Sequence, residues 1–173
     1  MRSSLRRRHL AAVPLLVAAS LAALPASDRA QAAESTDTVT VNVDVGAGIT
    51  IDVTTTAFTL AGLPGATAAT PGAVAVRVFT NNPTGYTVSV EPTAADLTGP
   101  GGAVIPAGDL QVRDTTVGGA YTNLTVGTPV TVNTKATASV AAGDLYTHDY
   151  QILIPSVPQG IYTGTLDYVA TTT

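Results

Sequence analysis

Apolar residues recur at every second position along much of this chain, and this alternation limits the folds that it can adopt. In residues 38–45 (TVTVNVDV) valines alternate with polar side chains, and the same period returns in residues 73–80, 86–90 and 144–155. A period of two places alternate side chains on opposite faces of an extended strand. After residue 32 no segment shows the 3.6-residue apolar period of an amphipathic helix. The pattern therefore predicts half-buried β-strands throughout.

Glycine- and proline-rich segments separate these runs and indicate turns. Turns are expected at 46–48, 81–85 and 157–160, and loops at 61–72 and 92–108. Strands are expected at 37–45, 49–53, 73–80, 86–90, 109–113, 121–126, 129–133, 137–140, 144–154 and 162–170. The five-residue turn at 81–85 predicts a hairpin between its flanking strands. The last two strands are expected to be antiparallel neighbours.

Eight to ten short antiparallel strands predict an all-β fold, an immunoglobulin-like or jelly-roll β-sandwich. A closed barrel is the alternative. Residues 33–173 have the length of one domain, and residues 33–37 read as a flexible lead. A domain of this size needs no disulfide for stability, and the chain has no cysteine.

The first 32 residues have the three parts of a secretory signal peptide. An arginine-rich start without acids precedes an apolar run at 11–26, and Ala30-Gln31-Ala32 supplies the small residues before a cut at Ala33. The apolar run is shorter than the ~20 residues of a typical membrane span; an uncleaved anchor is the alternative. We expect a secreted or cell-surface-associated bacterial protein, without a transmembrane segment once the signal is removed.

Removal of the signal makes the chain strongly acidic. The whole sequence has 8 basic and 12 acidic residues, and residues 33–173 keep 3 basic against 11 acidic ones, a formal net charge of −8. Such a surface repels phosphate backbones, so no nucleic-acid partner is expected.

The exported part has few residues suited to catalysis. It has no cysteine nucleophile and one histidine, His148, whose neighbour Asp149 points to the opposite face of the same strand. No Gly-x-Ser-x-Gly motif surrounds a serine. We therefore do not expect an enzyme; a small secreted hydrolase centred on His148 is the remote alternative.

The acidic residues are spread singly, and no EF-hand-type calcium loop is present. No cofactor is expected, although a loose Ca²⁺ site involving Asp96, Asp109 or Asp114 stays open. The alternation places most tyrosines in the core. Tyr146, His148 and Tyr150 share one strand face and are the candidates for a ligand or partner surface.

Three segments together resemble a known group of proteins: residues 82–90 (NPTGYTVSV), 150–155 (YQILIP) and 160–171 (GIYTGTLDYVAT). Their order is similar to that of the WxL-type surface proteins of Gram-positive bacteria and related secreted β-sandwich domains. The resemblance implies a sandwich fold and a cell-envelope setting. The two Trp-x-Leu motifs of that family are absent because the chain has no tryptophan, so attachment through them is not implied.

The expected function is that of a non-catalytic structural or adhesion-type protein, assembling through sheet edges with itself or with other surface proteins. The alternative is a module that binds carbohydrate or another cell-envelope polymer.

Overall fold

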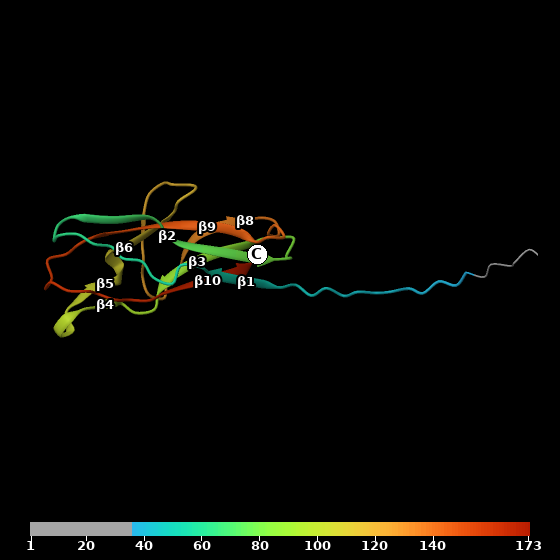
Figure 1. Ribbon diagram of the computed structural model, residues 1–173, viewed down its shortest axis with the longest axis horizontal. Helices are drawn as coiled ribbons and strands as arrows, with labels where there is room; N and C mark the ends of the chain where they lie inside the picture. Colours follow the sequence, from blue (N-terminus) through green and yellow to red (C-terminus); the bar gives the residue numbers. More distant parts are fainter. Residues whose placement is uncertain (1–35) are drawn as a thin grey trace, which may run out of the picture. The chain divides into compact units, whose positions relative to one another are not determined.

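The computed structural model describes residues 36–173, and in this part the chain folds almost entirely into β-strands (Figure 1). The strands are β1 (Ile49–Val53), β2 (Thr67–Thr80), β3 (Tyr86–Pro92), β4 (Asp96–Thr98), β5 (Val104–Pro106), β6 (Leu110–Asp114), β7 (Thr122–Asn123), β8 (Val130–Lys135), β9 (Asp144–Leu153) and β10 (Leu166–Thr172). Short 3-10 turns lie at Pro100–Gly102 (η1) and Ala107–Asp109 (η2). The predicted all-β fold is confirmed. The signal peptide predicted at residues 1–32 lies outside the described residues.

Two antiparallel sheets form the layers of a sandwich-like unit that comprises residues 43–173. Sheet A has the strand order β1-β2-β9-β6-β7, and sheet B has the order β10-β3-β8. Strands β4 and β5 pair as a separate two-stranded ribbon. This ribbon lies at the end of the unit opposite to the turn between β2 and β3 (Figure 1).

The core lies between the inner faces of the two sheets, as the alternation predicts. On β2 and β3 six inward side chains are at most 4% exposed: Val74, Val76 and Val78 on β2, and Tyr86, Val88 and Val90 on β3. Packing of these two faces removes a continuous apolar layer from water and stabilises the fold.

Strand β2 begins earlier than the sequence predicts, because residues 67–70 pair with β9 instead of forming a loop. The register shifts between Thr70 and Val74, around Pro71 and Gly72. Pro71 has no N–H to donate to a ladder, and Gly72 adopts a positive φ of 59°. A bulge at these two residues lets the strand continue through a sequence that resembles a loop.

Both predicted strand neighbours are wrong. Strands β2 and β3 belong to different sheets, so residues 81–85 carry the chain across the core and do not close a hairpin. Strand β9 lies in sheet A between β2 and β6, whereas β10 pairs with β3 in sheet B. Each of these strands has one apolar face. Two strands of this kind can bury their apolar faces as neighbours in one sheet, or as members of two sheets that pack against each other. The alternation does not distinguish the two arrangements.

The strand predicted at residues 37–45 is absent from the structure. Val39, Val41, Val43 and Val45 are 87%, 79%, 79% and 73% exposed, and no turn forms at residues 46–48. A strand needs a hydrogen-bonded neighbour, and the described residues supply none to this segment.

The remaining differences concern short elements. The loop predicted at 92–108 contains the β4–β5 ribbon and both 3-10 turns, the strand predicted at 121–126 shrinks to β7, and residues 137–140 form no strand. Within residues 36–173 no helix has both the length and the apolar character needed to cross a bilayer.

Candidate functional site

The three side chains predicted to form a ligand or partner surface face the core instead. Tyr146, His148 and Tyr150 all lie on the inner face of β9, where His148 and Tyr150 are 0% exposed and Tyr146 is half-buried. The sequence places them correctly on one face of a strand. It does not reveal that sheet B covers that face, and as a surface site the prediction is wrong.

His148 is held by hydrogen bonds on both ring nitrogens. Its Nε2 lies 2.7 Å from Asn133 Oδ1, and its Nδ1 lies 3.0 Å from the Tyr168 hydroxyl. Because the Asn133 oxygen can only accept, Nε2 carries the proton and Nδ1 accepts from Tyr168. The Tyr150 hydroxyl is 2.6 Å from that of Tyr168, and the Asn133 amide nitrogen donates to Asp114.

Burial determines the charge of this histidine. Loss of hydration lowers the pKa of His148 to about 4, although Asp114 and Asp149 act in the opposite direction. The imidazole is therefore neutral at pH 7 and stacks on the Tyr168 ring at a centroid distance of 5.4 Å. A hydrolase centred on His148 would need its substrate to reach a ring that has no exposed surface.

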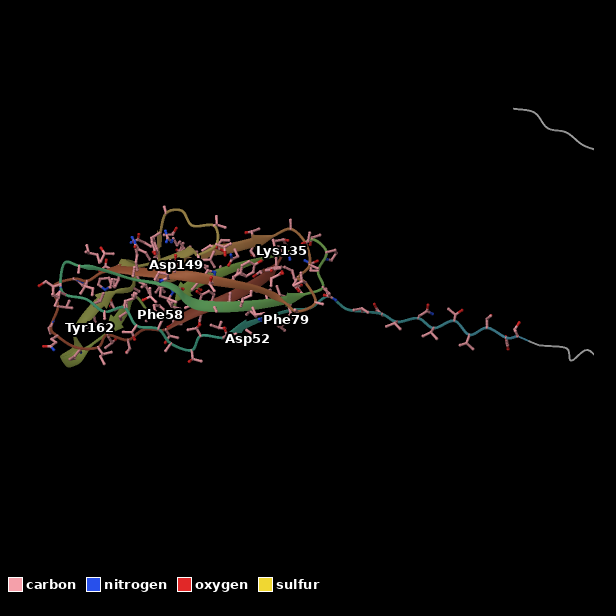
Figure 2. All side chains as sticks on the ribbon, turned by 45° about the horizontal axis from the view of Figure 1, so that its top comes forward. Asp52, Phe58, Phe79, Lys135, Asp149 and Tyr162 are labelled. Atoms are coloured by element: carbon pink, nitrogen blue, oxygen red, sulfur yellow. The ribbon has the colours of Figure 1, made fainter. Side chains whose placement is uncertain are left out.

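A second polar cluster ties the two sheets together near the start of β9. The Tyr86 hydroxyl on β3 donates to Asp144 at 2.5 Å and lies 2.8 Å from the Tyr146 hydroxyl. Lys135 on β8 contacts both Asp144 oxygens at 2.8 and 2.9 Å. Burial opposes ionisation of Asp144, but the Lys135 and Tyr86 contacts outweigh it and lower the pKa of this carboxyl group. Figure 2 shows Lys135 and Tyr162 at opposite ends of the sandwich.

Asp149 organises the outer face of sheet A. It is 2% exposed and accepts hydrogen bonds from the Gly72 N–H and the Thr115 hydroxyl, both at 2.7 Å. Its other oxygen lies 2.9 Å from Arg113 Nε, and the Arg113 guanidinium stacks over the Tyr121 ring at 4.4 Å. Burial opposes ionisation of Asp149, but the Thr115, Gly72 and Arg113 contacts lower its pKa. The carboxylate thereby fixes the β2 bulge to the loop after β6.

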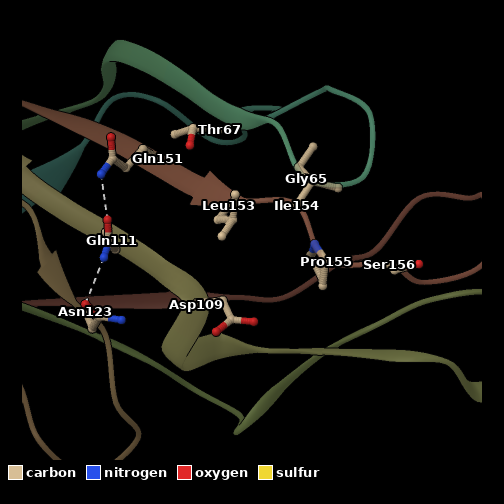
Figure 3. A pocket seen from close by; sticks show the side chains of 10 residues that line it. All are labelled: Gly65, Thr67, Asp109, Gln111, Asn123, Gln151, Leu153, Ile154, Pro155 and Ser156. Atoms are coloured by element: carbon tan, nitrogen blue, oxygen red, sulfur yellow. Dashed lines mark hydrogen bonds between the residues drawn. The ribbon is translucent and has the colours of Figure 1, made fainter.

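An open groove of about 550 Å³ crosses sheet A from β2 over β9 and β6 to β7 (Figure 3). Its floor is a row of three amide side chains: Gln151 on β9 donates to Gln111 on β6 at 2.6 Å, and Gln111 donates to Asn123 on β7 at 2.9 Å. The Asn123 amide also donates to the Gly108 carbonyl at 2.5 Å. We call this row the amide ladder.

The walls of the groove combine charge and apolar surface. The Asp109 carboxylate lies beside the ladder, and Leu153, Ile154 and Pro155 supply an apolar side. Leu153 is 59% exposed. Amide donors and acceptors, one carboxylate and an apolar platform are the groups that recognise hydroxyl-rich ligands.

The amide ladder is not predicted by the alternation in the sequence. Gln111 and Gln151 each occupy an outward position of an alternating strand, and this was the available signal. Their contact depends on the register that places Gln111 opposite both Gln151 and Asn123. That register follows from the strand order β9-β6-β7, which the alternation does not contain.

The three acids named for a loose Ca²⁺ site are not brought together. Asp114 is buried and accepts from the Thr116 and Val117 N–H groups, whereas Asp109 lines the groove and Asp96 begins β4. In the part of the chain that the structure describes, no three His, Asp or Glu side chains gather as metal ligands would.

Comparisons with known proteins assign no family. No protein family matches the chain. No curated protein resembles it significantly.

Proposed function

We propose that this chain is an exported, non-catalytic structural or adhesion-type protein of a bacterial cell surface, and that its sandwich assembles through a sheet edge. The observation that carries the proposal is the edge of sheet B at β10. Seven residues of β10 pair with β3 on one side, and no described strand pairs with the other side. Unpaired strand edges of this length act as templates for another strand.

The burial of β10 supports the same proposal. The inward residues of β3 are buried without exception, whereas Leu166, Tyr168 and Ala170 on the inner face of β10 are only half-buried. Strand β1 of sheet A already lies close to β10, and a further strand beyond β10 would cover the rest of these side chains. The edge therefore offers apolar surface as well as backbone hydrogen bonds.

The chemically versatile side chains have structural partners. Both nitrogens of His148 and both oxygens of Asp144 bond between the two sheets, and both oxygens of Asp149 bond on the outer face of sheet A. These groups stabilise the layers that present the edge. The signal peptide predicted at residues 1–32 and the resemblance to WxL-type surface domains support a cell-envelope location.

Fractionation tests the location and the assembly together. The full chain is expressed with its own N-terminus in a Gram-positive host, and medium, wall and cytoplasm are analysed by sequencing and electron microscopy. We expect an N-terminal residue of Ala33 and oligomers or filaments in the medium or wall fraction. Uncleaved chain in the cytoplasm would contradict export. Monodisperse monomer at every concentration would contradict the structural role.

The amide ladder favours a second candidate function, binding of a cell-envelope glycan. The groove presents three amides and a carboxylate next to apolar Leu153 and Pro155. Planar amides bond to pairs of hydroxyl groups, while an apolar platform covers the C–H face of a sugar ring.

Pull-down on purified wall glycan tests this candidate with a matched pair of variants. Gln111→Ala removes the central amide of the ladder, and Gln159→Ala removes an exposed amide outside the groove. Loss of hydrogen bonds to the sugar is expected to weaken retention at least about tenfold for Gln111→Ala only. Absence of wild-type retention at low salt would remove the candidate.

A further inference from the structure

Residues 38–45, here called the valine segment, have the alternating apolar pattern of a half-buried strand, but their side chains are exposed. Its four valines are between 73% and 87% exposed, although valine favours strands and apolar surroundings. In an extended chain the valines share one face, and Thr38, Thr40, Asn42 and Asp44 share the other. Eight residues of this kind form one strand, apolar on one side and polar on the other.

The connection to β1 holds the valine segment out of a local hairpin. The Asn81 side chain donates to the Gly46 carbonyl and accepts from the Gly48 N–H, both at 2.8 Å. A carbonyl and an N–H two residues apart face the same side in an extended chain. Asn81 therefore keeps residues 46–48 extended at the point where a fold-back onto β1 would need a turn.

The free edge of β10 has the geometry that such a strand needs. The Thr93 N–H donates to the Thr165 carbonyl, and the Thr173 N–H donates to the Gly85 carbonyl, so odd-numbered residues near β10 bond toward β3. Backbone groups of an antiparallel strand alternate in direction. The N–H and C=O groups that point away from β3 are therefore those of Leu166, Tyr168, Ala170 and Thr172.

The side chains of the same even-numbered residues point toward the core. Those of Leu166, Tyr168 and Ala170 are half-buried. A strand bonded to this edge would place its own apolar face over them. Its polar face would continue the outer surface of sheet B, which at Asp167 and Thr171 is exposed. The two faces of the valine segment match these two requirements, and its eight residues match the seven of β10.

We propose that the valine segment of one copy adds to sheet B of a second copy as a strand beside β10. This inference rests on the proposed assembly function and names the element that performs it. Each copy has one donor segment and one acceptor edge, and these are different elements, so the contact between copies is heterologous and propagates head to tail. The occupant is a second copy because Asn81 holds the connector of the same chain extended.

Paired variants of the full secreted chain test the donor. Val41→Lys/Val43→Lys places charges on the apolar face, and Thr40→Lys/Asn42→Lys adds the same charge to the polar face. We expect the valine variant to weaken association about 100-fold or more in sedimentation velocity, because two valines are no longer buried. The polar-face control should assemble. Both variants should keep the wild-type circular dichroism, since all four positions are exposed.

Mixed single-cysteine chains test the acceptor, and the absence of native cysteine makes the readout clean. Asn42→Cys chains are mixed with Val169→Cys chains or, as a control, with Thr131→Cys chains on β8; all three sites are exposed. Disulfide formation requires Cα atoms within about 7 Å. We expect mixed dimers with Val169→Cys and none with Thr131→Cys.

The outcomes separate the inference from the proposed function. Oligomers that survive Val41→Lys/Val43→Lys would overturn the inference and leave assembly through another edge. Monomers in every sample would overturn both. A monomeric wild type in which deletion of residues 38–45 destabilises the fold would show that the segment pairs within its own chain, which also overturns the inference.

Discussion

Two runs of alternating valines in this chain have opposite environments. Val74, Val76 and Val78 on β2 are between 0% and 4% exposed, whereas Val39, Val41, Val43 and Val45 are between 73% and 87% exposed. Their sequence patterns are nearly the same. The first run has β1 and β9 as hydrogen-bonded neighbours and sheet B across the core. The second run has no neighbour among the described residues. Alternation thus encodes the capacity to form a strand, and its neighbours decide the burial.

The largest expected effect comes from placing one charge in each run. Val76→Asp buries an unpaired carboxylate in the core and should destabilise the fold by more than about 4 kcal/mol, which removes most of the stability of a typical domain. Val43→Asp should change the free energy of unfolding of the monomer by less than about 0.5 kcal/mol. Urea denaturation followed by circular dichroism at low protein concentration measures both. Equal effects would show that the valine segment is buried within the monomer.

The buried valines of β2 lie beside His148, a group whose protonation depends on folding. The exposed valines of residues 38–45 have no such neighbour among the described residues. His148 has a pKa of about 4 in the folded chain and about 6.5 when unfolded. Between these values the unfolded chain binds the extra proton, so protonation favours unfolding. Stability is fully present above pH 6.5 and should fall by about 3 kcal/mol as the pH drops to 4.

Urea denaturation of wild type and His148→Gln at pH 7, 5.5 and 4.5 checks this expectation. The variant should lose the slope in this window, because His148 is the single histidine of residues 36–173. An unchanged slope in the variant would assign the acid sensitivity to other groups.

The partners of β2 include the Asp149 carboxylate, which holds its bulge. Asp149→Ala should destabilise the fold by about 2 kcal/mol, because it leaves the Gly72 N–H and Thr115 hydroxyl without their acceptor and frees a partly exposed Arg113. The matched variant Asp167→Ala removes an exposed carboxylate of β10 and should cost less than about 0.5 kcal/mol. Thermal unfolding of both variants provides the test. A larger loss for Asp167→Ala would contradict the structural role of Asp149.

The sequence predicts which residues form strands more reliably than it predicts their neighbours. The inner face of β9 follows from the alternation of Tyr146, His148 and Tyr150, because side-chain period is a local property. The pairing of β9 with β2 and β6 is not local, and the predicted pairing with β10 is wrong. The buried bonds of His148 to Asn133 and Tyr168 come from three strands in two sheets, so no spacing in the sequence marks them.

The groove and the bulge could not be predicted from the sequence, because both depend on contacts between strands that are distant in the chain. The amide ladder needs the register of β9, β6 and β7, and the bulge needs Asp149 to face Gly72 across two strands. Small residues at 67–72 give no strand signal of their own. Their pairing follows from β9, whose sequence carries the stronger pattern.

Hydrogen exchange across a concentration series tests the central claim most directly, since it reports the backbone partners of the valine segment. Assembly predicts that every second amide of residues 38–45, those facing β10, and the amides of Leu166, Tyr168, Ala170 and Thr172 become protected together, by about 100-fold or more, as concentration rises through the association range. Amides of β2 should stay slow throughout. Fast, concentration-independent exchange of residues 38–45 while the protein is oligomeric would contradict the account.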